Sequence, residues 1–435
     1  MDVRVEELGP TRKRIHVVVP QEAVKKEIED VYVALRKTAK VKGFRPGKIP
    51  REILKRYYND YVTEQVISRL IESTYKGAIS ESKILPVSLP NLENEGLTEG
   101  KPFRYSAVVE VEPEIKVDDY VGIPVTKGEI RVEEKEVAER LARLQQLHAQ
   151  LRRIEEERPV REGDFVLIDF RGTMDGKPFK GGQGQGVSVE IGAGRFAGEI
   201  ENGLVGARCD EEREIEAVFP EDHRDRALAG KKASFRVKVR EIREKVIPPL
   251  DDEFAKDLGS ESLEELREKV RGEIEEEKRL EVEREMNEQI LDHLIEKNRF
   301  EVPQSMVERQ IDALIRELKL GLAYQGVELN SAALDEERLR EDYRERAVRL
   351  VKSTLLLNRI AEMEGIEVSQ GELDREFEGI AGRADRTKSQ VEAYYSKENR
   401  AEGLRARLLE EKTLRFLREK ARVTDLQGKV RGGEQ

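Results

Sequence analysis

The chain has 435 residues, a formal net charge of −11, 39% charged residues, 5% aromatic residues and no tryptophan. This length accommodates roughly three domains of about 150 residues each, and the composition is typical of a strongly charged protein with much helix surface. No apolar run approaches the roughly 18 residues of a membrane span, and the N-terminus lacks the charged-then-apolar pattern of a signal peptide. We therefore expect a cytoplasmic protein without a membrane partner.

The sequence does not predict a metal or cofactor site. The histidines are far apart, at His16, His148, His223 and His293, and no Cys-x-x-Cys or His-x-x-x-His spacing occurs. The single cysteine, Cys209, cannot form an internal disulfide and is predicted to be a small buried residue. A Gly-x-x-x-x-Gly-Lys-Ser/Thr phosphate loop is absent from the sequence, which favours a function independent of ATP.

The first region predicts an α+β domain ending near Pro113. Apolar residues alternate over residues 3–5, 15–19 and 103–111, which indicates three strands. Apolar residues recur at helical spacing over residues 24–35 and 53–71, which indicates two helices. The resulting order is strand, strand, helix, loop, helix, strand.

A basic loop joins the two helices and reads Gly43-Phe44-Arg45-Pro46-Gly47-Lys48-Ile49-Pro50. Residues 36–56 contain nine cations and one acid, Glu52. Glycine permits backbone turns that other residues disfavour, and proline restricts φ, so the loop is stiff. Local positive charge in an acidic chain predicts an anionic partner. The alternative is a solvated loop whose Phe44 packs back onto its own domain.

A charge-rich linker or arm helix is predicted over residues 132–154, because its apolar residues recur every three or four positions. After Pro159 the chain predicts strands at residues 165–170, 187–191, 214–219 and 234–239, with a hairpin turn at Asp175-Gly176. Twelve of the 33 glycines lie from Gly163 to Gly206, which is typical of a turn-rich, strand-built region.

The C-terminal region predicts almost uninterrupted helix, since only one of the 15 prolines, Pro303, lies beyond Pro249. Ser262 and Glu265 predict a capping box at its first helix. Later helices are expected around residues 307–318, 348–360 and 404–417. Their charged faces are typical of solvated helix surface, whereas apolar side chains exposed on them would supply a broad, weak binding surface.

The loop from Gly43 to Pro50 resembles the ribosome-docking signature of the trigger factor family, bacterial chaperones that meet chains leaving the ribosome. The order of the regions resembles that family over essentially the whole chain. The resemblance implies a ribosome-binding domain at 1–113, a linker and arm helix at 114–158, a prolyl isomerase domain of the FK506-binding-protein (FKBP) type at 159–246 and a helical substrate-binding chaperone domain at 247–435. The implied partners are the large ribosomal subunit near the tunnel exit, nascent and unfolded polypeptides, and a second copy in a weak homodimer.

The same resemblance implies which residues touch the ribosome. Phe44 and Arg45 would contact a ribosomal protein, and Lys48 would lie near acidic side chains or RNA phosphate, which makes docking salt-sensitive. The implied ribosome-binding residues are Gly43, Phe44, Arg45, Pro46, Gly47 and Lys48.

Residues 166–172 and 175–179 resemble the first two pocket strands of FKBP-type isomerases. Such a pocket needs no nucleophile, because the X–Pro bond has only to twist over a barrier of roughly 18 to 20 kcal/mol, and a dry pocket favours the twisted amide. The implied catalytic residues are Phe170, Phe179, Val187, Phe196, Ala197, Ile200, His223 and Phe235. At Val187, Ala197, Ile200 and His223 the chain departs from the bulkier or aromatic residues usual in the family, which implies weak turnover.

Alternatives remain open at this point. The phenylalanines also fit ordinary barrel core, and His223 also fits a surface loop. The favoured function is a ribosome-associated, ATP-independent chaperone with a built-in prolyl isomerase. One rival is a free cytosolic prolyl isomerase with accessory helices. The other is an RNA-binding assembly factor, which the overall acidity of the chain disfavours.

Overall fold

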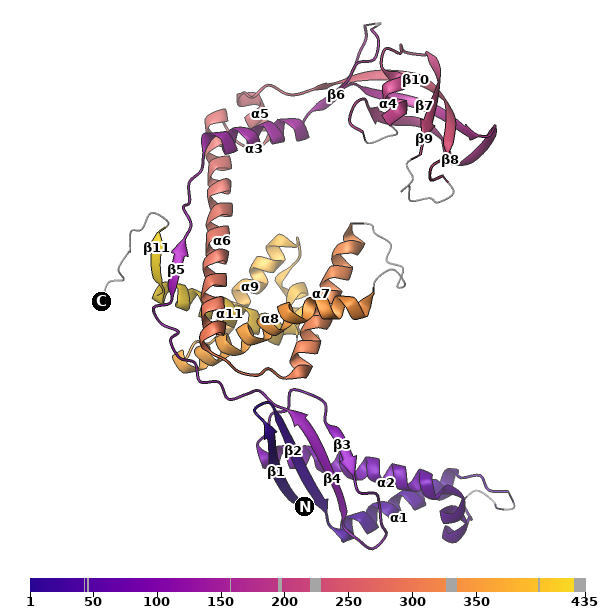
Figure 1. The fold of residues 1–435 in the computed structure, drawn as a ribbon, viewed down its shortest axis with the longest axis vertical. Coiled ribbons are helices and arrows are strands. Elements are labelled where there is room, and N and C mark those ends of the chain that lie inside the picture. Colours follow the sequence, from indigo (N-terminus) through magenta and orange to yellow (C-terminus); the bar gives the residue numbers. More distant parts are fainter. Residues whose placement is uncertain are drawn as a thin grey trace. The chain divides into compact units, whose positions relative to one another are not determined.

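The structure, a computed structural model, describes residues 1–42, 44, 47–156, 158–194, 198–219, 228–325, 335–397 and 400–425. The chain forms two compact units, Met1–Gly128 with Glu283–Gln435, and Glu129–Val282 (Figure 1). The first contains an α+β domain and a set of C-terminal helices, and the second contains an antiparallel sheet with short helices. Within the described ranges no helix is long and apolar enough to cross a membrane.

The N-terminal domain is a four-stranded antiparallel sheet with two helices against one face (Figure 1). The strand order is β1 (Asp2–Gly9), β2 (Arg12–Val19), β4 (Phe103–Glu110), β3 (Asn91–Asn94). The alternating residues of β2 and β4 enter the core together with the apolar faces of α1 (Gln21–Thr38) and α2 (Arg51–Ser82). The predicted strands and helices are thus confirmed. The short edge strand β3 was not predicted, because all four of its residues are exposed and show no alternation.

Prolines set where both helices begin. Pro20 precedes α1 with φ −65°, and Pro50 precedes α2 with φ −63°. This φ already suits a helix, and the missing N–H of proline costs nothing at a helix start. Helix α2 is kinked at Tyr58, whose φ of −129° and ψ of 18° are not helical. The hydroxyl of Tyr58 donates to the carbonyl of Lys40 at 3.1 Å, which ties the kink to the residues after α1.

The sheet of the second unit has five antiparallel strands. They are β6 (Gln150–Arg153), β7 (Phe165–Met174), β8 (Lys177–Glu190), β9 (Glu212–Val218) and β10 (Lys232–Val246), and β10 pairs with β6, β7 and β9. Asp175 and Gly176 join β7 to β8 with φ of 48° and 76°. Two positive φ values are typical of the type I′ turn, so the predicted hairpin is confirmed. Helix α4 (Gly198–Leu204) contributes Ile200 and Leu204 to the core of this sheet.

The helix predicted over residues 132–154 is wrong at its C-terminal end. Helix α3 (Glu134–Leu147) stops early, and Gln150–Arg153 pair with the last residues of β10 as β6. The physical reason is that only Val137 and Leu141 of α3 are buried, whereas Leu147 is 72% exposed. Helix α3 packs with α5 (Asp252–Asp257) and the start of α6 (Leu263–Lys297) in a small separate core.

The C-terminal region is mostly helical, as predicted. It contains α7 (Gln304–Tyr324), α8 (Glu336–Glu364), α9 (Gln370–Arg383), α10 (Lys388–Tyr395) and α11 (Arg400–Lys420). Strand β11 (Arg422–Asp425) follows α11 and pairs in parallel with β5 (Pro124–Lys127), which the sequence did not predict. Both strands are only four residues long, so they carry no periodic signal.

Two further predictions need correction. The capping box of α6 is only half formed: Ser262 accepts from the N–H of Glu265 at 3.3 Å, but the Glu265 carboxylate accepts from the N–H of Glu261 instead of that of Ser262. Cys209 is exposed, not buried, and its thiol donates to the carbonyl of Arg240 at 3.1 Å. Cys209 lies in the turn before β9, where its neighbours Arg208 and Asp210 are exposed as well.

Candidate functional site

Four phenylalanines lie together on the inner face of the five-stranded sheet. Phe170 comes from β7, Phe179 from β8, Phe235 from β10, and Phe219 directly follows β9. The ring centroid of Phe235 lies 6.1 Å from that of Phe170, 6.0 Å from Phe179 and 6.4 Å from Phe219. Interplanar angles of 60° to 84° are those of edge-to-face packing, which aromatic rings favour.

Glycines inside the strands make room for these rings. A Cβ on Gly172 would lie 2.5 Å from Phe235 Cε1, one on Gly182 would lie 2.8 Å from Phe179 Cε1, and one on Gly184 would lie 2.6 Å from Phe170 Cε1. Real Cβ atoms do not approach so closely, so any other residue at these positions would displace a ring. The glycine-rich stretch therefore contains ring contacts as well as the turns that the sequence predicts.

The remaining predicted pocket residues divide into two groups. Ile200 of α4 is 1% exposed and belongs to the same core cluster as Phe170 and Phe235, with half-buried Val187 packed against it. The structure thus brings together Phe170, Phe179, Val187, Ile200 and Phe235. Phe196, Ala197 and His223 lie outside the described residues. Phe170 and Phe235 are buried, whereas Phe179 and Phe219 are half-buried at the edge of the cluster.

Sequence reasoning missed Phe219 as a pocket residue. Ile215, Ala217 and Phe219 alternate, and the first two are buried, so the period of two already places Phe219 on the inner face.

A buried carboxylate lies next to Ile200 and was also missed. Glu201 is 2% exposed, and its Oε2 accepts from the N–H of Gly192 at 3.0 Å and from that of Gly194 at 2.9 Å. Both glycines have positive φ, 88° and 65°, which other residues rarely adopt. Glu201 therefore fixes the backbone that leads from β8 into the segment containing Phe196 and Ala197.

A largely buried ion pair between Arg158 and Asp164 holds the start of β7. The Arg158 guanidinium donates to both oxygens of Asp164, at 2.6 and 2.8 Å, and the N–H of Arg161 donates to the same carboxylate at 2.8 Å. Burial opposes the ionisation of Asp164, but these donors outweigh it and hold the Asp164 pKa below its ordinary value. The pair is structural, because it lies outside the phenylalanine cluster.

Chemically, the cluster can bind an apolar side chain or a proline ring and exclude water from it. The described side chains of the cluster are apolar. Twisting an X–Pro bond removes amide resonance. A pocket that excludes water and fits the twisted form therefore lowers the barrier to isomerisation without proton transfer.

The basic loop of the N-terminal domain is anchored after Phe44. The N–H of Gly47 donates to the carbonyl of Arg36 at 3.0 Å, Gly47 has φ 82°, and Ile49 is buried in the domain core. Phe44 is 39% exposed, so part of its surface is accessible to a partner. Lys48 is exposed as well. Gly43, Arg45 and Pro46 lie outside the described residues.

Two tyrosines beside this loop were not predicted as contact residues. Tyr57 and Tyr61 are 65% and 50% exposed and lie four residues apart, on one face of α2. Tyr61 and Tyr58 also line a cavity of about 400 Å³ between the end of α1 and α2. Helical spacing places Tyr57 with the apolar residues Ile53 and Leu54, but the kink at Tyr58 accompanies its exposure.

Comparison with known proteins assigns the family. A family model described as "Bacterial trigger factor protein (TF)" matches residues 1–144, and "Bacterial trigger factor protein (TF) C-terminus" matches 262–419. "FKBP-type peptidyl-prolyl cis-trans isomerase" matches 156–240. The trigger factor of Syntrophotalea carbinolica is 38% identical over 97% of this chain and 96% of its own. That of Geotalea daltonii is 37% identical over 99% of both chains.

A solved structure described as "Promiscuous Substrate Recognition in Folding and Assembly Activities of the Trigger Factor Chaperone" matches with a TM-score of 0.54 and 24% identity. The match covers 96% of this chain and 99% of the other, and it supports the fold. The identities of 38% and 37% to the two relatives, over 97% and 99% of this chain, are sufficient to assign the family. The chain therefore belongs to the trigger factor family of chaperones, and it carries an FKBP-type peptidyl-prolyl isomerase domain.

Proposed function

We propose that this chaperone is a bacterial, cytoplasmic protein that docks on the large ribosomal subunit near the tunnel exit. There it binds nascent chains without ATP and isomerises their X–Pro bonds. The observation that carries the docking proposal is the exposed Phe44 on a loop held by Gly47 and Ile49. A solvent-exposed phenylalanine on an anchored basic loop is a typical protein-binding feature, because its burial supplies affinity only when a partner is present.

Charge around Phe44 supports an anionic partner. Arg51 is engaged by Glu29 at 2.7 Å, and Lys55 by Glu99 at 2.6 Å. In contrast, Lys40, Lys42, Lys48 and Arg56 take part in no ion pair among the residues that the structure describes. Such free cations can attract RNA phosphate or acidic side chains, and the attraction weakens as salt rises.

The phenylalanine cluster supports the isomerase proposal. We propose Phe170, Phe179, Val187, Ile200 and Phe235 as its described catalytic residues, together with Phe219, and we keep Phe196, Ala197 and His223 as predicted members. Ile200 and Val187 leave a smaller apolar surface than aromatic side chains would, so turnover is expected to be weak.

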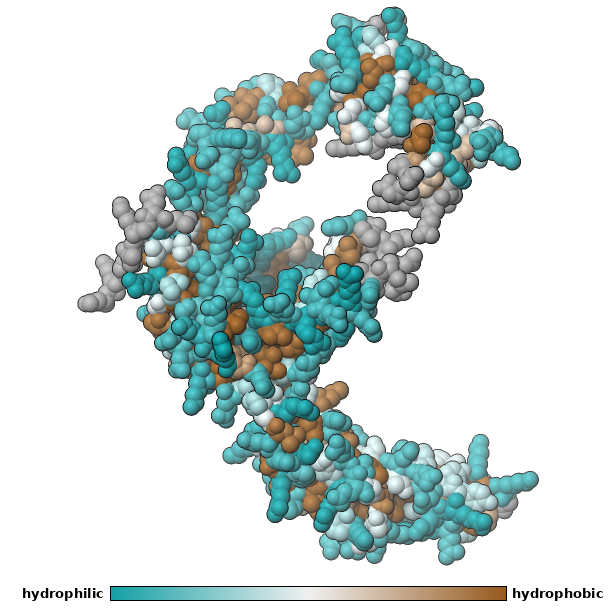
Figure 2. Space-filling model, viewed as in Figure 1, coloured by the Kyte–Doolittle hydropathy of each residue, from teal (hydrophilic) through white to brown (hydrophobic). Residues whose placement is uncertain are grey.

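For client binding we propose the C-terminal helices as the main surface. Figure 2 shows that hydrophilic residues cover most of the drawn face, with separate hydrophobic patches among them. Large apolar residues are exposed singly, for example Leu320 and Tyr324 on α7 and Met363 on α8. Leu85 and Leu89 of the N-terminal domain are 85% and 92% exposed and add a second apolar area. Scattered small contacts fit weak, reversible binding of many clients.

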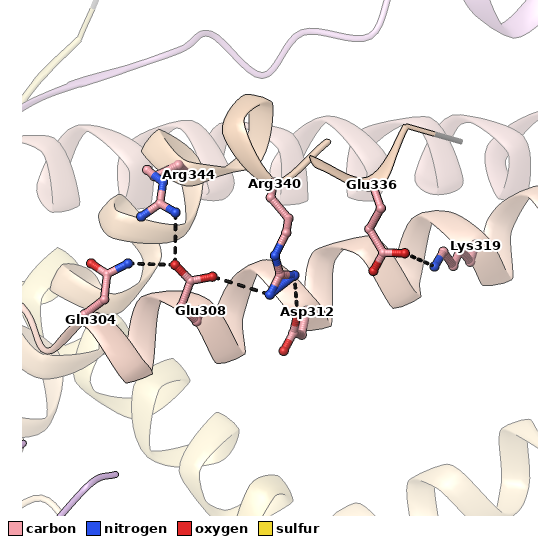
Figure 3. A network of polar contacts seen from close by, with 7 residues as sticks. All are labelled: Gln304, Glu308, Asp312, Lys319, Glu336, Arg340 and Arg344. Atoms are coloured by element: carbon pink, nitrogen blue, oxygen red, sulfur yellow. Dashed lines mark hydrogen bonds and ion pairs between the residues drawn. The ribbon is translucent and has the colours of Figure 1, made fainter. Parts of the chain in front are cut away.

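A ladder of polar contacts connects α7 and α8 (Figure 3). Glu308 of α7 accepts from Arg344 at 2.9 Å and pairs with Arg340 at 3.4 Å, and Arg340 also reaches Asp312. Lys319 and Glu336 form a further rung at 3.4 Å. The ladder residues are spaced by four on α8 and by four and then seven on α7, so they lie along one face of each helix. Each half-exposed pair is worth only about 0.2 to 1 kcal/mol, so the ladder fixes register more than it adds stability.

The docking proposal is tested by cosedimentation with 70S ribosomes. We expect the triple variant Phe44→Ala, Arg45→Ala, Lys48→Ala to lose binding and keep its fold, and Phe44→Ala alone to cause most of the loss. A buried aromatic anchor contributes about 2 kcal/mol or more, whereas an exposed ion pair contributes about 0.2 to 1 kcal/mol.

The matched control is Lys25→Ala, Lys26→Ala, Val33→Ala, which removes the same charge and an exposed apolar residue from α1. Equal binding of the triple variant and the wild type at moderate salt would disprove docking through this loop. The free isomerase would then be the better description. The domain boundaries at 113, 158 and 246 and the weak homodimer remain proposals.

A further inference from the structure

The outer face of the isomerase sheet, opposite the phenylalanine cluster, carries a polar groove of about 750 Å³. We call it the back groove. It crosses β8, β7, β10 and β9, and its central residues are Gln183, Arg171, Thr173, Ser234, Arg236 and Glu214. Its volume is within the range of ligand sites. The proposed chaperone and isomerase functions do not use this face.

Most charges on this face have an opposite charge beside them. Lys232 pairs with Glu216 at 2.6 Å, Arg240 with Asp169 at 2.6 Å, and Lys238 with Asp210 at 3.1 Å. The carboxylate of Asp169 is also held by the N–H of Gly186 at 2.9 Å, and these contacts lower its pKa. The face is therefore a compensated cross-strand pattern of the kind that stabilises sheets.

Arg171 and Arg236 depart from this pattern because they face each other across β7 and β10, although Glu214 is the neighbour of Arg236 on β9. They are direct cross-strand partners in the β7–β10 register, and both are exposed. Over the described ranges neither guanidinium makes a hydrogen bond or ion pair with a carboxylate. Glu214, the cross-strand neighbour of Arg236 on β9, instead accepts from the hydroxyl of Ser234 at 3.2 Å. Like charges directly opposite each other destabilise a sheet, so the arrangement has a cost that a bound anion would remove.

We propose that Arg171 and Arg236 bind the carboxylates of acidic side chains in an extended polypeptide. The planar guanidinium matches a carboxylate in a two-point geometry. Gln183, Thr173 and Ser234 lie beside the pair and offer amide and hydroxyl groups to peptide N–H and C=O groups.

The charge of the rim selects a polypeptide over a nucleic acid. Glu212 and Glu214 line the β9 side of the back groove. The closely spaced phosphates of a nucleic acid would be repelled by these two carboxylates. A polypeptide can place separate aspartates or glutamates against the arginines and uncharged residues beside Glu212 and Glu214. The charged residues of the back groove alternate along β7 and β10 with residues of the phenylalanine cluster, and Phe170 lines the back groove as well.

The test is fluorescence anisotropy of full-length protein with a labelled ten-residue peptide that contains two aspartates and no proline. The reference is the same peptide with asparagines. We expect Arg171→Gln to weaken binding of the acidic peptide by about three- to tenfold at low salt. Lys232→Gln, the same charge change at a paired position outside the groove, should leave it unchanged.

Arg171→Glu separates binding from stability. It places a carboxylate beside Arg236 and completes the alternation of charge, so the melting temperature of the domain should rise while peptide binding is lost. The proposal is overturned if the asparagine peptide binds equally well, or if folded Arg171→Glu keeps its affinity. Equal weakening by Lys232→Gln would show unspecific attraction and also overturn it. Tighter binding of oligouridylate would identify a nucleic-acid site, and displacement by micromolar succinate would identify a small-acid site.

Discussion

At the residue scale, the buried carboxylate of Glu201 is the least expected feature of the isomerase site. It is 2% exposed and accepts from two glycine N–H groups at 3.0 and 2.9 Å. We therefore assign it as a positioning residue: it holds the Gly192–Gly194 backbone, and through it the segment that carries two predicted pocket residues.

Substitutions at Glu201 test this role. Glu201→Met removes the acceptor at similar volume and leaves two N–H groups without a partner, so we expect a rise in KM for a proline peptide. A loss of stability of about 1 to 3 kcal/mol should accompany it. Glu201→Gln keeps one oxygen that can accept both bonds and should restore most of the substrate affinity. If both variants lower the melting temperature but leave KM unchanged, Glu201 is merely structural.

Ile200 provides the second residue-scale prediction. If the small side chains thin the pocket, Ile200→Phe should accelerate refolding of a proline-limited substrate. Because Ile200 is 1% exposed, the larger ring should also cost about 1 to 3 kcal/mol of stability through overpacking. Refolding rates at equal concentrations of folded protein, with Ile200→Leu as the volume-matched control, separate the two effects. A folded Ile200→Phe variant that is no faster would rule out the thin pocket as the limit on turnover.

At the element scale, α9 has the complete capping box that α6 lacks. Ser369 accepts from the N–H of Glu372, and the Glu372 carboxylate accepts from the N–H and hydroxyl of Ser369. Lys412 of α11 donates to the same carboxylate at 2.7 Å. The hydrogen bond from Lys412, aided by those from Ser369, lowers the Glu372 pKa from 4.5 to about 2. One carboxylate thus caps α9 and connects it to α11.

This connection predicts a pH dependence. The folded-state pKa lies below the unfolded value, so the stabilisation is complete above about pH 4.5 and is lost as pH falls toward 2. Glu372→Gln should therefore lower the melting temperature at pH 7, and its deficit relative to wild type should shrink between pH 4.5 and 2. Thermal melts followed by circular dichroism measure this, with Glu419→Gln on α11 as the control. A deficit that does not change with pH would contradict the assignment.

At the scale of the whole molecule, the isomerase sheet is inserted between elements that hold each other. Helix α3 lies before it and α5 and α6 lie after it, yet they share one core. Gln145 near the end of α3 donates to the carbonyl of Pro248 at 2.7 Å, which brings the two ends of the inserted segment together. A short linker can therefore replace the segment without opening that core.

We expect a variant with residues 150–246 replaced by a short Gly/Ser linker to suppress aggregation of a denatured client almost as well as the full chain. The deletion begins at residue 150 because β6 belongs to the sheet. The reason is that the exposed apolar residues of the C-terminal helices and the N-terminal domain remain. Light scattering at equimolar protein compares full chain, deletion and isolated sheet domain. Protection by the isolated domain alone would instead favour an isomerase with accessory helices.

The sequence by itself determined the long elements of this protein and their order. Period-two alternation in β2 and β4, helical spacing in α1, α7, α8 and α11, and the Asp175-Gly176 turn are local patterns, so they can be interpreted without a partner. The motif of residues 43–50 likewise led to the family, and Phe170, Phe179, Ile200 and Phe235 do lie in one cluster.

Only the tertiary structure decided the features that depend on distant residues. Residues 150–153 form β6 because β10 offers a free edge, and β5 and β11 pair across almost 300 positions of the chain. Gly172, Gly182 and Gly184 contact phenylalanine rings because the fold brings these rings close. For the same reason Glu201 accepts from backbone N–H groups of the loop after β8. The unpaired Arg171 and Arg236 depend on register as well. The physical reason is common to all. A short segment or a single residue shows no periodic pattern in the sequence, so its role depends on the group that the fold places beside it.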